Sequence, residues 1–135
     1  MIKIIYGPKG TGKTKTLIDE ANNIVSSAKG HLIFVTNTKR YMYDLHRDIR
    51  FIDTSDFMVA GEEALIGFIK GVVAANNDNE YLFIDGAARI AGKDLKDMAA
   101  FYYVLERLAE QNGLTVYVTC SAAKEELPEF IAKYI

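Results

Sequence analysis

The stretch Gly7-Pro8-Lys9-Gly10-Thr11-Gly12-Lys13-Thr14 decides the fold, because it matches the pattern G-x-x-x-x-G-K-[ST]. Its glycines let the backbone turn so that successive N–H groups point into one concavity, which can hold the β-phosphate of a nucleotide. Lys13 is placed to reach the β- and γ-phosphates, and the hydroxyl of Thr14 is placed to bind Mg²⁺. We therefore predict that this stretch is a P-loop, which binds a nucleoside triphosphate with Mg²⁺, and we expect the nucleotide to be ATP.

The residues on either side of the loop have the pattern that this mechanism needs. The apolar run from Ile2 to Tyr6 predicts a strand that leads into the loop. From Lys13 to about Ala28 the apolar residues recur at helical spacing, and the N-terminus of such a helix adds partial positive charge beside the phosphates. Lys9 does not fit the extra signature lysine of ParA-like ATPases, which would fall at Pro8, so we expect its side chain to be a solvated charge.

Further along the chain, short apolar runs alternate with longer helical stripes. This alternation predicts an α/β fold, a P-loop NTPase-like three-layer αβα sandwich with a mostly parallel sheet. We expect further strands at residues 32–35, 50–53, 81–84 and 114–119, helices at 62–75 and 94–111, a short helix or loop at 37–48, and a last helical turn opened by Pro128. With no repeat and no linker, residues 1–135 are expected to form a single nucleotide-binding domain.

A second acidic position resembles a Walker B site. Tyr81-Leu82-Phe83-Ile84 is followed at once by Asp85, so a buried strand would deliver a carboxylate beside the loop, where it could hold Mg²⁺ together with Thr14. Lys13 and Asp85 are therefore the candidate catalytic residues. Many ATPases place a glutamate next, to activate water, but this chain has Gly86, so we expect slow hydrolysis. Glu62, Glu63 and Asp53 are the candidates for a substitute base.

Thr119 ends the last predicted strand and has two interpretations. By its order in the chain it resembles the polar γ-phosphate sensor of RecA and AAA ATPases, which ends a strand lying between the P-loop strand and the Walker B strand. An ordinary hydroxyl that caps the next turn explains it equally well. The candidate nucleotide-binding residues are Gly7, Pro8, Lys9, Gly10, Thr11, Gly12, Lys13, Thr14, Lys15 and Thr119.

The composition excludes several classes of function. Half of the residues are hydrophobic and a quarter are charged, as in an ordinary globular protein, and the net charge of −2 gives no indication of nucleic-acid binding. The single Cys120 and the two separated histidines offer no zinc site. The apolar run at the N-terminus is too short for a signal peptide or a membrane span, so we expect a cytoplasmic protein.

Over nearly its whole length the chain resembles a group of small single-domain P-loop proteins of Firmicutes, which carry the labels "ATP-binding" or "twitching motility" protein. The resembling segments are Tyr6 to Thr14, Arg40-Tyr41-Met42-Tyr43-Asp44-Leu45, Glu80 to Gly86, and Leu127-Pro128-Glu129-Phe130. The resemblance implies the P-loop fold and Mg-nucleotide binding. It implies no biological task, and the chain lacks the length and the separate N-terminal domain of pilus retraction motors.

Two classes of function stay open. The first is a slow ATPase or a nucleotide-dependent switch whose state is read by a protein partner, with residues 37–50 as the candidate reading surface. The second is a small-molecule kinase that uses the same loop, with the basic residues Lys39, Arg40, Arg47 and Arg50 as a candidate lid. Guanine-specific GTPases and transporter ATPases are excluded because their signature motifs are absent from the sequence.

Overall fold

A computed structural model describes all residues, 1–135. Its centre is a five-stranded sheet in the order β1-β5-β4-β2-β3, and every neighbouring pair of strands is parallel. The strands are β1 (Ile2–Gly7), β2 (His31–Thr36), β3 (Ile49–Asp53), β4 (Asn79–Ile84) and β5 (Thr115–Ser121). The predicted α/β class and the parallel sheet are therefore confirmed.

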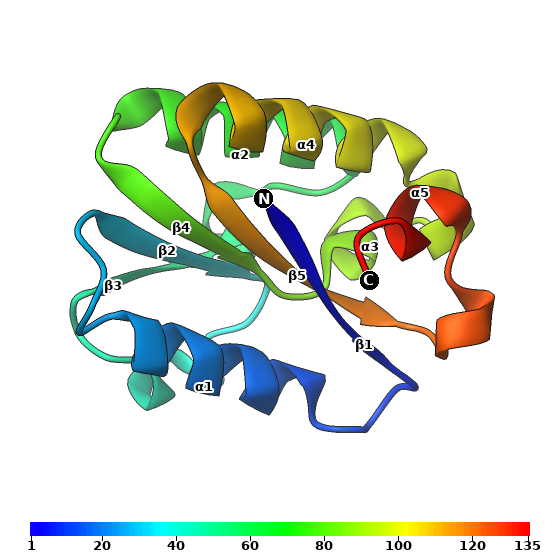
Figure 1. Ribbon diagram of the computed structural model, residues 1–135, viewed down its shortest axis with the longest axis horizontal. Helices are drawn as coiled ribbons and strands as arrows, with labels where there is room; N and C mark the ends of the chain where they lie inside the picture. The colour runs from blue at the N-terminus through cyan, green and yellow to red at the C-terminus, as the bar shows by residue number, and fades with distance from the viewer.

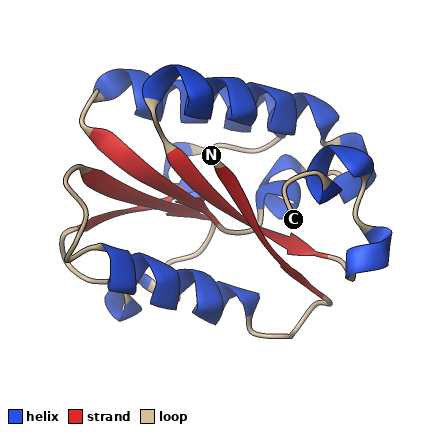
Figure 2. Cartoon of the chain, viewed as in Figure 1, coloured by secondary structure: helices blue, strands red, loops and turns tan.

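Helices cover both faces of this sheet (Figure 1). Helix α1 (Lys13–Ile24) lies on one face, and α2 (Glu62–Ala75) and α4 (Ala99–Asn112) lie side by side on the other. The shorter helices α3 (Ala87–Ala91) and α5 (Glu129–Ala132) lie near the carboxyl ends of the strands (Figure 2). Single 3₁₀ turns occupy η1 (Met42–Asp44), η2 (Thr54–Phe57), η3 (Leu95–Asp97) and η4 (Lys124–Glu126). None of the helices has the length and apolar character needed to cross a membrane.

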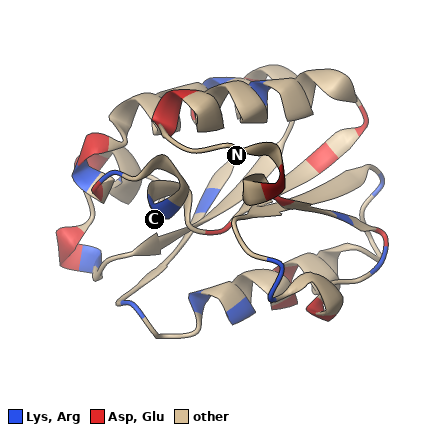
Figure 3. Cartoon of the chain, turned by 180° about the vertical axis from the view of Figure 1, so that it is seen from behind, with Lys and Arg blue, Asp and Glu red and all other residues tan.

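The central strands are apolar on both sides because each face carries a helix layer. In β2, Leu32 and Phe34 pack with Leu17 and the rest of the α1 side, whereas Ile33 and Val35 pack with the α2 and α4 side. Aromatic rings form a row across the α1 side of the sheet, with stacked pairs between neighbouring strands: Phe51–Phe34, Phe34–Phe83 and Phe83–Tyr117. Charged residues lie mainly on the helices and loops around this core (Figure 3).

Parallel strands place all their carboxyl ends at one edge of the sheet, which is where ligands bind in open α/β folds. Here that edge receives Gly7 from β1, Thr36 from β2, Asp53 from β3, Asp85 after β4 and Thr119 near the end of β5. Strand β5, which carries Thr119, lies between β1 and β4, so the expected strand order is observed.

Two expected elements differ from those observed. The first helix ends at Ile24 rather than near Ala28, because Ser27 turns its hydroxyl back to the Ile24 carbonyl at 3.1 Å and competes with the helix. The helix expected at residues 94–111 begins only at Ala99, after η3. A 3₁₀ helix has about three residues per turn, close to the period of an α-helix. The spacing of apolar residues therefore could not reveal the boundary between η3 and α4.

Helix α3 was not expected at all. Its five residues are fewer than the 11 or so over which helical periodicity becomes visible. Three other expected elements are confirmed: residues 50–53 belong to β3, residues 37–48 contain the single short helix η1, and Pro128 is the N-cap of α5.

Candidate functional site

The glycine-rich loop, Gly7 to Thr14, connects β1 to α1. Gly10 and Gly12 adopt left-handed backbone with φ of 82° and 78°, a conformation that favours glycine. The Thr11 hydroxyl donates to the Pro8 carbonyl at 2.6 Å, and a Cβ on Gly7 would lie 2.8 Å from that hydroxyl oxygen. The loop is therefore folded back on itself, and a side chain at Gly7 would require the Thr11 side chain to move.

The backbone N–H groups from Lys9 to Lys15 have no hydrogen-bond partner within the chain. They include the first turn of α1, whose amides have no acceptor inside the helix. The amino group of Lys13 donates to the Pro8 carbonyl at 2.9 Å and so folds over the same loop. The loop thus offers a run of free donors and one ammonium group on an exposed surface, the donor set that an anion needs.

Asp85 lies beside this loop and is almost fully buried, at 4% exposure. The Thr14 hydroxyl is 3.1 Å from Oδ1 and 3.2 Å from Oδ2 of Asp85, although the two residues are 71 positions apart in the chain. The backbone N–H of Asp85 donates to the Val35 carbonyl at 2.9 Å, which continues the pairing of β4 with β2 past the end of β4. The two residues that the sequence predicts as metal ligands are therefore in direct contact.

Two further threonines surround the Asp85 carboxylate. The hydroxyl of Thr119 donates to Oδ1 at 2.9 Å and accepts from the Gly86 N–H at 3.0 Å. The hydroxyl of Thr36 lies 3.4 Å from Oδ2, a long and weak hydrogen bond. Thr119 therefore uses its hydroxyl to hold Asp85 and the following turn. Sequence reasoning missed Thr36, although its position at the end of a predicted strand could have indicated it.

Gly86 occupies the position where a glutamate is common, and the structure gives a physical reason for the glycine. Its φ is +76°, in the left-handed region. The guanidinium of Arg89 packs against it so closely that a Cβ would lie 2.6 Å from the arginine Cζ. A side chain at this position would be strained and would displace Arg89.

Two of the three other acids considered as bases are already paired. Asp53 accepts from the Ser55 hydroxyl at 2.7 Å and from Lys39 at 3.0 Å, and Lys39 also contacts Asp56. Burial alone would raise the pKa of Asp53, but these hydrogen bonds outweigh it and hold the pKa below its usual range. Glu62 pairs with Lys93 at 2.9 Å. Glu63 is exposed in the first turn of α2.

The residues present fit a magnesium ion only together with a nucleotide. No group of three or more His, Cys, Asp or Glu side chains comes together that could hold a metal alone. Thr14 and Asp85 supply oxygen atoms, the donors that Mg²⁺ prefers, and Mg²⁺ commonly completes its shell with substrate phosphates and water. Of the remaining candidates, Lys15 pairs with Asp19 at 3.2 Å on the exposed side of α1, and Lys9 is exposed.

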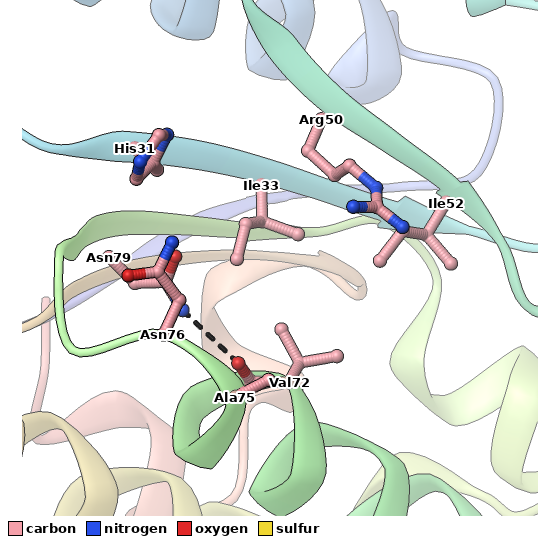
Figure 4. A pocket seen from close by; sticks show the side chains of 8 residues that line it. All are labelled: His31, Ile33, Arg50, Ile52, Val72, Ala75, Asn76 and Asn79. Atoms are coloured by element: carbon pink, nitrogen blue, oxygen red, sulfur yellow. Dashed lines mark hydrogen bonds between the residues drawn. The ribbon is translucent and has the colours of Figure 1, made fainter.

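A cavity of about 270 Å³ lies elsewhere, at the amino ends of β2, β3 and β4 (Figure 4). Its lining includes His31, Arg50 and Asn79 on the strands and Val72 on α2. The amide of Asn79 donates to the Val72 carbonyl across it at 3.1 Å. This cavity lies at the opposite edge of the sheet from the glycine-rich loop, so it is separate from the candidate site.

No protein-family model matches the chain, and no curated protein matches it. The geometry of the loop and of Asp85 is therefore the basis on which a function is inferred.

Proposed function

We propose that this protein binds a nucleoside triphosphate, ATP, with Mg²⁺ at the glycine-rich loop, and acts as a P-loop nucleotide-dependent switch with slow ATPase activity. One observation carries the proposal: the Thr14 hydroxyl meets the Asp85 carboxylate at 3.1 Å, directly beside a run of unpaired loop amides. Hydrogen-bond donors for an anion thus lie beside oxygen ligands for a cation, which is what a magnesium–triphosphate complex requires.

Each part of the site has a defined task in this proposal. The amides from Lys9 to Lys15 and the N-terminus of α1 hold the β-phosphate. Lys13 releases the Pro8 carbonyl and pairs with the β- and γ-phosphates, where its charge strengthens the hydrogen bonds. Bound Mg²⁺ would neutralise phosphate charge and orient the terminal phosphate. Thr14 can face a cation with its oxygen lone pairs while its proton stays on Asp85, because a hydroxyl both donates and accepts.

Slow hydrolysis follows from the residues around Asp85. Gly86 offers no side chain to orient water, and a side chain at this position would be strained. Asp53 and Glu62 form ion pairs with Lys39 and Lys93, so a role for either carboxylate as the water-activating base would compete with that pairing. A protein that holds the triphosphate for a long time is suited to a switch whose nucleotide state is read by a partner, and we place such a switch in the cytoplasm.

Isothermal titration tests the proposal. Wild-type protein should bind ATP in the presence of Mg²⁺, and Lys13→Ala should abolish measurable binding because it removes the ammonium group from the phosphates. Lys9→Ala is the matched control, since it removes an exposed lysine from the same loop. Equal affinity in the wild-type and Lys13→Ala proteins would refute the proposal. A broad screen for phosphate transfer to small molecules tests the kinase alternative, which predicts transfer far faster than hydrolysis.

A further inference from the structure

A second cation, Arg89, lies at Asp85 and has no task in the phosphate-binding scheme above. It comes from α3, the helix that the sequence did not reveal. Its Nη2 is 3.7 Å from Asp85 Oδ2, and its Nε donates to Asn37 Oδ1 at 3.1 Å. One guanidinium thus links the candidate metal ligand to the first residue after β2.

Two features fix where this guanidinium lies. It packs against the Cα of Gly86, in space that any side chain there would fill. The side chain of Asn37, which follows β2 and lies 52 positions away in the chain, accepts a hydrogen bond from Arg89 Nε. The position of Arg89 is therefore set by β4 and β2 together.

The contact with Asp85 is loose, and most of the donors on Arg89 are unused. A separation of 3.7 Å is an ion pair but is too long for a hydrogen bond. Asp85 already accepts hydrogen bonds from Thr14 and Thr119. A guanidinium has about five N–H donors in a planar fork, and here only Nε has a hydrogen-bond acceptor. The side chain is 56% exposed, so the fork is accessible to a ligand.

Arg89 is also close to the glycine-rich loop. Both Thr14 and Arg89 contact the same oxygen, Asp85 Oδ2, at 3.2 Å and 3.7 Å. The guanidinium is therefore no farther from the Thr14 hydroxyl than those two distances laid end to end. A phosphate chain held at the first turn of α1 would have its far end within reach of a side chain as long as arginine.

We propose that Arg89 contacts the terminal phosphate of the bound triphosphate and transmits its presence to Asn37. This inference rests on the function proposed above. A planar guanidinium matches two phosphate oxygens at once, and a phosphate accepts stronger hydrogen bonds than a carboxylate that other donors already occupy. In moving to the phosphate, Arg89 strains or breaks its bond to Asn37, which begins the segment Asn37–Arg50. A diphosphate lacks the terminal group and leaves the bond in place.

The test compares affinities for ADP and for a non-hydrolysable ATP analogue, both with Mg²⁺. Wild-type protein should prefer the triphosphate, and Arg89→Ala should lower triphosphate affinity about tenfold, the low end for a hydrogen bond to a charged group because the site is partly exposed. Affinity for ADP should stay unchanged. Arg89→Lys should keep only part of the preference, because lysine keeps the charge and loses the fork. Arg107→Ala, which removes an exposed arginine from α4, is the control and should behave as wild type.

Hydrogen exchange on the same samples tests the transmission. In the wild type, the triphosphate analogue but not ADP should change exchange in residues 37–50, whereas both ligands should protect amides 9–15. Arg89→Ala and Asn37→Ala should each lose the response at 37–50 and keep the protection at 9–15.

The possible results distinguish the role of Arg89 from the proposed binding of nucleotide at the loop. If the loop amides are protected but Arg89→Ala keeps the preference for the triphosphate, Arg89 is only a structural clamp on Asn37 and the inference is wrong. If residues 37–50 respond alike with and without Arg89, no signal passes through it. If neither nucleotide binds wild-type protein or protects the loop, the proposed function fails, and the inference fails with it.

Discussion

Replacing Thr119 by valine isolates the hydrogen bonds that hold Asp85. Valine keeps the branched shape that β5 packs, but it removes a hydroxyl that donates to a buried carboxylate at 2.9 Å and accepts from the Gly86 N–H at 3.0 Å. Thr119 itself is 7% exposed, so water cannot readily replace the lost partner. Asp85 and the turn that begins α3 would each lose one hydrogen bond.

The expected loss of stability can be worked from these two bonds. A hydrogen bond to a charged group contributes about 1.5–3 kcal/mol, and an orphaned amide costs about 1–3 kcal/mol, with the partly buried Gly86 N–H toward the lower end. Because the two bonds share one hydroxyl and the turn can relax, we expect a loss of about 2.5–4 kcal/mol, the lower part of their combined range. For a domain of this size the melting temperature would fall by roughly 3–5 °C per kcal/mol.

Urea denaturation followed by circular dichroism measures this loss directly. The unfolding midpoint should fall in Thr119→Val while the slope with urea stays the same, which marks a change in stability alone. Thr119→Ser keeps the hydroxyl and loses only a methyl group, so it should retain most of the wild-type stability. A loss of less than 1 kcal/mol in Thr119→Val, or equal losses in the two variants, would refute the view that Thr119 acts by holding Asp85.

Three other predictions concern Cys120, Asp53 and Gly86. Burial raises the pKa of the Cys120 thiol, which also contacts the Tyr102 hydroxyl at 3.2 Å, so a thiol reagent at pH 8 should modify the protein only after unfolding. The pKa of Asp53 is lowered in the folded protein, so its contribution to stability is present above its unfolded pKa near 3.8 and is lost as the pH falls through the lower folded value. The stability difference between wild type and Asp53→Asn, measured by urea unfolding, should therefore shrink as the pH falls from 5 toward 2. Basal phosphate release from ATP should be far below the median enzyme turnover of about 10 per second, because Gly86 provides no base; rapid release without a partner would contradict this.

The fold was largely predictable because its signals are local. Strand β4 and Asp85 are recognised from four apolar residues and a carboxylate, and α2 from its apolar stripe, whose predicted bounds match the observed ones. The loop is recognised from residue types at fixed spacing. Such signals need no knowledge of which strand lies beside which.

The missing parts of the site depend on tertiary placement. Thr36 reaches Asp85 only because β2 pairs with β4, a pairing between strands that are not consecutive in the chain. Arg89 reaches Asn37 across 52 residues through a helix too short to show periodicity. The glycine at position 86 looks like a missing base in the sequence, whereas the structure shows a left-handed turn that the arginine covers.

Mapping of amide chemical shifts by nuclear magnetic resonance tests the central claim most directly. The chain of 135 residues is small enough for each amide to be followed while Mg²⁺ and an ATP analogue are added. We expect the largest shifts at the amides from Lys9 to Lys15, followed by Gly86 beside Asp85. Shifts that instead cluster around His31, Arg50 and Asn79, at the cavity on the opposite edge of the sheet, or no shifts at all, would contradict nucleotide binding at the glycine-rich loop.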